Sequence, residues 1–368
     1  MSDIWGIAKI FLFWRLGLLA VTYLGSFTFP LSSNGGLGAP TVTKPFDFWL
    51  SWAQWDGGHF YTIAQRGYQL MTDYAFFPLY PLLIKISTKI FPQFILPTGL
   101  LISNLSFLLF LIIFFKFVEK RYRSEVAYNS LVSILVFPTA FFAVSFYSEG
   151  LFLFLSVLVF YFLYRKNLLL SSIFALLAAT TRVAGIFLTI PLFYNYFWSI
   201  SYNIKNLSSK AFIPFISTFG FALWAIYLFA KTNDPLRFVN TQTLWQRSAS
   251  DPLSTIIGNL WILITSPKLP FDQYFDLGIT LLFLGILIWG VKKIPSSLWI
   301  FSILVILLPL SSGTLTSMPR YALGSLGAFI AIGRFLEDHP KFRFPLWGAS
   351  LVLQAILAVR FINGYWVA

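Results

Sequence analysis

Residues 97–118 read PTGLLISNLSFLLFLIIFFKFV, an apolar run with a single charged side chain, Lys116. A helix needs about 20 predominantly apolar residues to cross the roughly 30 Å hydrocarbon core of a bilayer. The run has that length, and exposing its side chains to water would be unfavourable. It therefore predicts a membrane-spanning helix.

Runs of the same kind recur along the whole chain of 368 residues. Hydrophobic residues make up 58% of the sequence, charged residues 11%, and the mean hydropathy is +0.77, whereas about a quarter of the residues of a typical soluble domain are charged. The sequence predicts an all-α polytopic membrane protein with about eleven transmembrane helices in a single domain, residues 1–368. The other expected spans are 4–29, 127–146, 149–164, 168–182, 183–199, 211–230, 274–291, 296–312, 320–336 and 344–362.

The net charge of +13 lies mostly in short loops between the apolar runs. Examples are KRYR at 120–123, RK at 165–166 and KK at 292–293. Cytoplasmic loops of membrane proteins carry such an excess of Lys and Arg. The charge is therefore interpreted as a sign of orientation, with the N-terminus in the cytoplasm, and no binding of nucleic acid is expected.

Residues 76–91, FFPLYPLLIKISTKIF, are apolar but short, with Lys85 and Lys89 one helical turn apart. Amphipathic helices of this kind lie in the membrane interface. If this segment crossed the membrane, the basic loops would face outward, against the charge rule. We therefore expect an interfacial helix within a long first outward loop, residues 30–96, and a second outward loop at 231–273.

Few cofactors suit this composition. Cysteine is absent and only two histidines, His59 and His339, occur, which argues against disulfides and against Cys- or His-rich metal sites. A divalent ion held by carboxylates stays open, but their spacing gives no recognisable cage, so no metal is predicted. Neither a phosphate-binding loop nor a dinucleotide-binding glycine motif is present in the sequence.

The densest polar cluster follows the first span. The stretch WDGGHFYTIAQRGY, residues 55–68, holds Asp56, His59 and Arg66, and Asp73 follows closely. The pattern predicts a helix that begins near Asp56. An aspartate there can cap the helix by accepting backbone N–H bonds, or it can act as a general base at the mouth of a membrane cavity.

Three further charged residues lie at the outward ends of expected spans: Glu149, Arg182 and Arg320. A charged side chain at a span centre costs about 2.5–3.5 kcal/mol on insertion scales, and such residues mark pathways or sites. Near a span end, an arginine can instead anchor the helix by reaching the interface. Together with the Asp56 cluster, an acid and several arginines on one face favour transfer chemistry on a lipid-phosphate substrate.

The order of these motifs resembles a known family. The stretch WDGGHFYTIAQRGY followed by AFFPLYPLL (75–83) is similar to the signature of the PIG-V family, the GPI mannosyltransferase 2 type, which has many bacterial relatives. FPTAFFAVSFYSEGLF (137–152), RVAG (182–185) and PRY (319–321) resemble later segments of the same family. In this sequence Asp73 stands where family members often carry a Glu before the AFFP string.

The resemblance implies a GT-C fold and a glycosyltransferase, a mannosyltransferase type of enzyme that uses a polyprenyl- or dolichyl-phosphate sugar as donor and no bound nucleotide. It implies that Asp56 is the base that activates the acceptor hydroxyl, with inversion at the anomeric carbon, and that His59 orients Asp56 or a sugar hydroxyl. The residues expected to bind substrate are Arg66, Asp73, Glu149, Arg182, Arg320 and Tyr321.

The expected partners are the bilayer, the polyprenyl-phosphate sugar and a glycan or glycolipid acceptor. The expected location is the plasma (inner) membrane of a prokaryote, as a multi-pass protein with its active site on the outer face. A different class stays open, because transporters and flippases of lipid-linked glycans also have ten or more spans, about as many as here. A non-catalytic membrane subunit is a further alternative. Either of these would tolerate the loss of Asp56, whereas a transferase would not.

Overall fold

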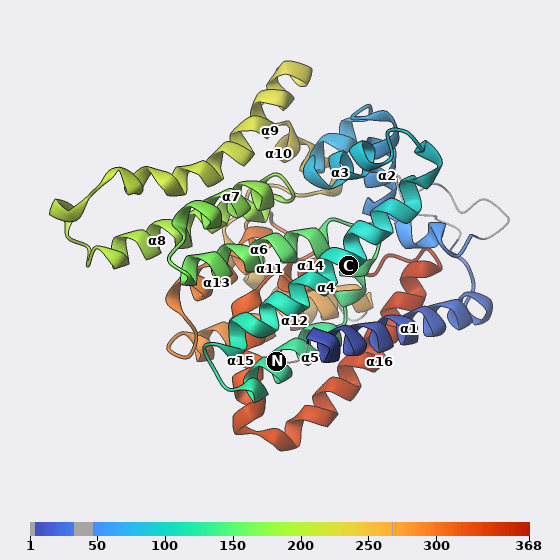
Figure 1. Cartoon of the computed structure of the whole chain (residues 1–368). Helices are drawn as coiled ribbons and strands as arrows, with labels where there is room; N and C mark the ends of the chain where they lie inside the picture. The colour runs from blue at the N-terminus through green and yellow to red at the C-terminus, as the bar shows by residue number, and fades with distance from the viewer. Residues whose placement is uncertain (1–3, 33–46, 267, 269) are drawn as a thin grey trace. The chain divides into compact units, whose positions relative to one another are not determined.

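The computed structural model of the chain describes residues 4–32, 47–266, 268 and 270–368 (Figure 1). Within these residues every regular element is a helix and no strand occurs. Residues 33–46 of the expected first outward loop lie outside the described part. The chain divides into two compact units, residues 1–154 with 332–368, and residues 155–331. The expected single domain over 1–368 stays a prediction.

The first unit holds the N-terminal helices and the C-terminal one. Its α-helices are α1 (Ile4–Thr28), α2 (Asp56–Arg66), α3 (Leu79–Ser87), α4 (Ile95–Glu119), α5 (Ser124–Leu135) and α16 (Arg343–Ile362). Short 3-10 helices lie between them: η1 (Leu50–Ala53), η2 (Met71–Ala75), η3 (Pro92–Phe94), η4 (Ala140–Val144) and η9 (Pro340–Phe342). The boundaries between the units fall within α6 (Glu149–Tyr164) and α15 (Leu326–Asp338).

The helix α1, dark blue in Figure 1, packs against the red α16. Trp14 donates its indole N–H to the Gln354 side chain at 2.9 Å. Arg15, the next residue of α1, is a buried cation. It donates a hydrogen bond from Nε to Asn104 Oδ1 on α4 at 2.9 Å, and its guanidinium carbon lies 4.3 Å from the ring centre of Trp52. The hydrogen bond and the aromatic ring together offset part of the cost of burying a cation.

The second unit comprises most of the middle of the chain. Its helices are α7 (Leu168–Ala179), η5 (Val183–Leu188), α8 (Thr189–Ser199), η6 (Ile204–Asn206), η7 (Ser209–Phe215), α9 (Ile216–Thr232), α10 (Arg237–Asn240), η8 (Thr241–Trp245), α11 (Pro252–Thr265), α12 (Phe271–Gly290), α13 (Ser296–Leu310) and α14 (Met318–Ala322). Small residues allow the closest contacts. A Cβ atom on Gly185 would lie 2.3 Å from the carbonyl carbon of Ala178 on α7, and one on Gly220 would lie 2.3 Å from the Leu176 oxygen.

Five helical segments of the described chain are long and apolar enough to cross a membrane: Ile4–Thr28, Pro92–Glu119, Ser209–Thr232, Phe271–Gly290 and Pro340–Ile362. Five shorter apolar helical segments accompany them. All five long segments coincide with expected spans. The expected spans 127–146 and 320–336 are each broken, the first after Leu135 and the second between Ala322 and Leu326. The count of eleven spans stays a prediction.

The segment expected to be interfacial, residues 76–91, contains the nine-residue helix α3. At 1.5 Å per residue, a helix of this length is far too short for a hydrocarbon core of about 30 Å. Tyr80 and Ile84 are fully buried, whereas Leu82 and Ile86 are exposed. The helix therefore has one face for packing and one for contact with lipid or water.

Candidate functional site

The helix α2 begins at the motif that the sequence singled out. Trp55 is its N-cap residue, with a φ of +56° and no capping side-chain hydrogen bond, and Asp56 is the first helical residue. Asp56 is therefore not the N-cap. Its half-buried carboxylate lies in the first turn, where the positive end of the helix dipole favours a negative charge.

Close packing holds this helix start in place. The Tyr147 hydroxyl donates a hydrogen bond to the Gln54 carbonyl at 2.7 Å, and the Phe146 amide donates to the Trp52 carbonyl at 3.0 Å. A Cβ atom on Gly57 would lie 3.1 Å from the Tyr147 ring and 3.2 Å from the Phe146 carbonyl. The first glycine after Asp56 therefore lets α2 approach the segment that precedes Glu149.

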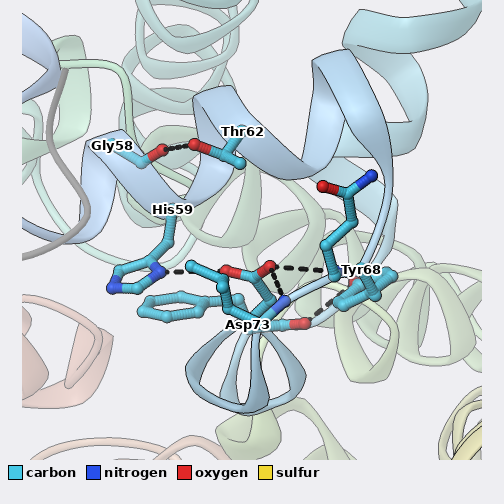
Figure 2. Close-up of polar contacts among 8 residues, drawn as sticks. Gly58, His59, Thr62, Tyr68 and Asp73 are labelled. Carbon is cyan, nitrogen blue, oxygen red and sulfur yellow. Dashed lines mark hydrogen bonds and ion pairs between the residues drawn. The ribbon is translucent and has the colours of Figure 1, made fainter.

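His59 and Asp73 form a buried pair (Figure 2). His59 Nδ1 lies 3.1 Å from Asp73 Oδ1, and the other carboxylate oxygen accepts hydrogen bonds from the backbone of Gln69 at 3.1 Å and Leu70 at 2.8 Å. Asp73 is 0% exposed and His59 5%. The imidazole also stacks on the Phe76 ring, with ring centres 4.7 Å apart and planes at 19°. The ring of His59 is thus fixed on two sides.

Asp56 and Arg66, the other charged candidates on α2, lie at opposite ends of that helix. His59 is three residues after Asp56 on α2, so the two side chains share one helix face. Arg66 is exposed in the last turn of α2, where a cation is favourable for the helix dipole. The structure therefore joins His59 with Asp73 and leaves Arg66 at the far end of the helix.

Glu149 is the first residue of α6 and is 3% exposed. Its negative charge acts on the Tyr80 hydroxyl. Burial is the main cause of the raised pKa of Tyr80, a hydrogen bond with Ser103 lowers this pKa, and the charge of Glu149 raises it further. The Ser103 hydroxyl in turn donates to the Tyr147 carbonyl at 2.9 Å. The YSEG motif is therefore packed against α3 and α4.

The second unit contains a group that we name the arginine cluster, namely Arg182, Arg247, Arg320 and Tyr321. Arg247 Nη1 donates to the Tyr321 hydroxyl at 3.0 Å, and Nη2 donates to the Thr316 carbonyl at 3.1 Å. The guanidinium carbons of Arg182 and Arg247 lie 5.6 Å and 5.8 Å from the centre of the Tyr321 ring. Arg320, next to Tyr321 on α14, is 8% exposed.

The arginine cluster changes the acidity of its phenol. Burial alone raises the pKa of Tyr321, but the positive charges of Arg247, Arg182 and Arg320 outweigh that effect and lower the pKa below its ordinary value. An anion close to this hydroxyl would experience the same positive potential. The cluster is therefore suited to holding a negatively charged group, and arginine forks match the geometry of phosphate oxygens.

The sequence reasoning identified three members of the arginine cluster and missed Arg247. This residue lies in the loop expected to be the second outward one, residues 231–273, where Gln, Asn, Thr and Asp are its neighbours in the sequence. It follows η8, and its guanidinium reaches Thr316 and Tyr321 because the chain reverses at Gln246, which has a φ of +57°. Nothing in the local sequence distinguishes it from a solvated loop arginine.

A search of the described residues finds no group of three or more His, Asp or Glu side chains placed to hold a metal ion. The prediction of no metal stays a prediction. His59 and Asp73 are engaged with each other.

Comparison with known proteins places these residues in a family. Residues 38–233 match the family described as Mannosyltransferase (PIG-V), a range that includes Asp56, His59, Asp73, Glu149 and Arg182. The chain belongs to this family. The resemblance seen in the sequence motifs is thereby confirmed. No curated protein matches the chain.

The fold of this PIG-V family member is similar to solved structures of membrane glycosyltransferases. The structure of ArnT from Cupriavidus metallidurans bound to undecaprenyl phosphate matches with a TM-score of 0.53 and 14% identity, over 94% of this chain and 63% of that one. The Archaeoglobus fulgidus oligosaccharyltransferase matches with a TM-score of 0.44 and 11% identity, over 96% of this chain and 55% of that one. The chain thus spans about 63% of the length of ArnT.

These findings confirm the expected fold class. The described chain is all-helical, has several helices of membrane-spanning length and shares its fold with ArnT, a GT-C glycosyltransferase. The PIG-V family member is therefore a multi-pass integral membrane protein with a GT-C-type fold.

Proposed function

We propose that this PIG-V family member is a glycosyltransferase that moves a sugar, mannose by family, from a polyprenyl-phosphate donor to a hydroxyl of a glycan or glycolipid acceptor. The observation that carries the proposal is the face of α2 with Asp56 and His59, which lies inside the segment that matches the family. The undecaprenyl phosphate bound to the structurally similar ArnT supports a lipid-phosphate donor.

In the proposed reaction Asp56 is the general base. Its carboxylate takes the proton of the acceptor hydroxyl as the oxygen attacks the anomeric carbon. The bond from this carbon to the phosphate oxygen breaks at the same time, and its electron pair stays on the phosphate. Attack from the side opposite the leaving group inverts the anomeric centre. His59 assists as the second catalytic residue on the same helix face.

The arginine cluster is proposed to bind the phosphate of the donor. When the glycosyl bond breaks, a phosphate diester becomes a monoester and gains negative charge. Preorganised cations at such a position stabilise the transition state more than the ground state. Arg182, Arg320 and Tyr321 serve this role in the proposal, and Arg247 joins them through its hydrogen bond with Tyr321. Glu149 and Arg66 are proposed to bind sugar or acceptor hydroxyl groups.

The proposed location is the plasma (inner) membrane of a prokaryote, with the N-terminus in the cytoplasm and the reaction on the outer face. The support is the concentration of Lys and Arg in the loops at 120–123, 165–166 and 292–293, which favours a cytoplasmic position for those loops. The proposal includes no nucleotide, because the lipid-phosphate donor carries the activated sugar itself. It includes no metal, because arginines can stabilise the growing charge on the leaving phosphate.

The test is transfer of labelled mannose from polyprenyl-phosphate-mannose in membranes that contain equal amounts of wild type or Asp56→Asn. Loss of general-base catalysis lowers rates about 10²–10⁴-fold, so we expect almost no product from the variant. Asp47→Asn is the matched control. Asp47 accepts backbone hydrogen bonds from Trp49 and Leu50 through Oδ1, and asparagine retains that acceptor.

Two results would contradict the proposal. Wild-type membranes that transfer no sugar from any lipid-phosphate donor would favour the transporter or non-catalytic subunit. Full transfer by Asp56→Asn would remove Asp56 from the reaction and leave the base to another residue.

A further inference from the structure

The contacts of Asp73 carry an inference about its role, and this inference rests on the proposed transferase reaction. We propose that Asp73 is a positioning residue that holds His59 as the Nδ1–H tautomer, so that Nε2 of His59 accepts the proton which Asp56 removes from the acceptor. Asp73 thereby acts through His59 and does not contact substrate.

The first step of the argument concerns Asp73 itself. Its side chain is fully buried, and Oδ2 accepts two backbone hydrogen bonds, from Gln69 and Leu70. Oδ2 is thus an acceptor for two backbone N–H groups. Both of its oxygens bond to protein groups, and the residue is 0% exposed. A buried charge of this kind needs a partner, and Oδ1 finds it in His59.

The second step concerns the imidazole. An ionised carboxylate only accepts hydrogen bonds, so in this proposal His59 Nδ1 carries the proton in the 3.1 Å contact with Asp73 Oδ1. A neutral imidazole has one N–H, and Nε2 is then the nitrogen with the lone pair. The stacked ring of Phe76 restricts rotation of the imidazole. In this proposal Asp73 determines which nitrogen can take a proton, and the stacking on Phe76 holds the plane of the ring. Figure 2 shows the contact between His59 and Asp73.

The third step is the path of the proton. Asp56 and His59 lie one helical turn apart on one face of α2. In each turnover the acceptor proton passes to the Asp56 carboxylate as the glycosyl bond to phosphate breaks, and then from Asp56 to His59 Nε2. Asp56 returns to its ionised form, and the imidazolium is stabilised by the negative charge of Asp73 before it releases the proton to water.

The alternative is that Asp73 has only a structural role, in which Oδ2 caps the start of η2. Asp73→Asn separates the two roles. The asparagine oxygen can still accept from Gln69 and Leu70, while its amide group donates toward His59 Nδ1. The ring must then switch to the Nε2–H tautomer. The loop is preserved and the proton acceptor is lost.

The tautomer can be measured directly, because the chain has only two histidines. Nitrogen-15 NMR of selectively labelled protein in detergent gives one set of ring signals for each, and His339→Gln assigns them, since His339 is exposed outside this cluster. At neutral pH we expect the Nδ1–H form of His59 in wild type and the Nε2–H form in Asp73→Asn. Wild type with the Nε2–H form overturns the inference without any need for a folded variant.

Activity gives the second measurement. We expect Asp73→Asn to lower kcat about 100-fold or more, as for loss of a proton acceptor, with the donor KM changed less than about threefold. His59→Gln should lose a similar factor, and the double variant should be no worse than either single variant, because residues that act as a unit are non-additive. If the two reductions in kcat multiply in the double variant, Asp73 only caps η2. The same conclusion follows if the tautomer switches in Asp73→Asn while kcat stays normal.

The matched control is Asp47→Asn, another carboxylate that caps a 3-10 helix through backbone hydrogen bonds. It should change neither the tautomer of His59 nor kcat. The experiments distinguish failure of the proposed function from failure of the proposed role of Asp73. If wild type transfers no sugar, the proposed function and the proton path fall together. If wild type is active and its His59 carries the proton on Nε2, only this inference falls.

Discussion

Arg247 and Tyr321, which are 74 residues apart in the sequence, are joined by a hydrogen bond of 3.0 Å from Nη1 to the phenol oxygen. The contact links the segment that follows η8 to α14. Because Tyr321 accepts the bond from an arginine, its own O–H is available as a donor. The pair therefore offers a ligand both a guanidinium and a phenol.

The acidity of Tyr321 gives a first prediction. Its pKa lies below the ordinary tyrosine value because the three arginines outweigh the opposite effect of burial. Alkaline titration at 295 nm should show an early phase to which Tyr321, one of the 17 tyrosines, contributes, and Tyr321→Phe should remove one tyrosine from that phase. Arg247→Gln should shift the phase to higher pH. An unchanged titration curve in Tyr321→Phe would contradict the effect of the arginine cluster.

The sign for stability follows from the same shift. A group whose pKa is depressed in the folded state contributes stability that is fully present above its unfolded pKa, about 10 for tyrosine, and that is lost as the pH falls through the folded value. Tyr321→Phe should therefore lower the melting temperature relative to wild type more at pH 10 than at pH 7.

Arg247 gives the second prediction. Arg247→Gln removes a positive charge and a planar guanidinium from the arginine cluster. The donor KM should therefore rise about tenfold, which corresponds to a loss of roughly 1.4 kcal/mol of binding free energy. Arg247→Lys should keep the positive charge but not the pair of hydrogen bonds to Tyr321 and Thr316. Arg165→Gln is the control, because Arg165 also lies over a tyrosine, Tyr161, at 4.6 Å but is exposed. Equal effects of the two Gln variants would contradict a specific role for Arg247.

Gly57 gives the third. In Gly57→Ala the new methyl group must displace the Tyr147 ring or the Phe146 carbonyl, which lie 3.1 and 3.2 Å from its position. Overpacking of this kind costs about 1–3 kcal/mol. We expect a lower melting temperature and a loss of transfer, because the start of α2 moves. Gly17→Ala, where nothing lies within 4 Å, should be neutral, and a neutral Gly57→Ala would show that the helix start adapts freely.

Gly185 gives a fourth prediction, on folding. A Cβ atom there would lie 2.3 Å from the backbone of Ala178, which has no flexible side chain that can move away. Gly185→Ala should therefore destabilise the protein by more than Gly57→Ala, with little folded protein recovered in detergent. Gly278→Ala, with open space around it, is the comparison. Normal recovery of Gly185→Ala in a size-exclusion profile would contradict the close contact between η5 and α7.

Apolar length was a good guide to the long helices and a poor guide to their breaks. The run at 97–118 corresponds to α4, Ile95–Glu119, because composition alone decides whether a segment of that length leaves water. The span expected at 127–146 ends at Leu135, where Pro138 follows. Proline disfavours a helical conformation in the residue before it, but hydropathy carries no information on that restriction.

In the candidate site, too, the sequence predicted most of the residues but not the contacts between them. His59 and Asp73 were both expected in it, since charged side chains are conspicuous in an apolar chain. Their pairing was not foreseen, because Asp73 reaches His59 through the turn at Gly67 and the helix η2. Arg247 was missed for the same reason: a contact across 74 residues depends on the tertiary fold and leaves no local pattern.

Arg15 has a consequence for biogenesis. Its partner Asn104 is 89 residues later in the chain, so α1 leaves the ribosome long before α4 exists. Until then the guanidinium in the middle of a nascent hydrophobic helix carries an insertion penalty of roughly 2.5–3.5 kcal/mol. The apolar side chains of α1 must offset this penalty until α4 has been translated and Asn104 can accept the hydrogen bond of Arg15.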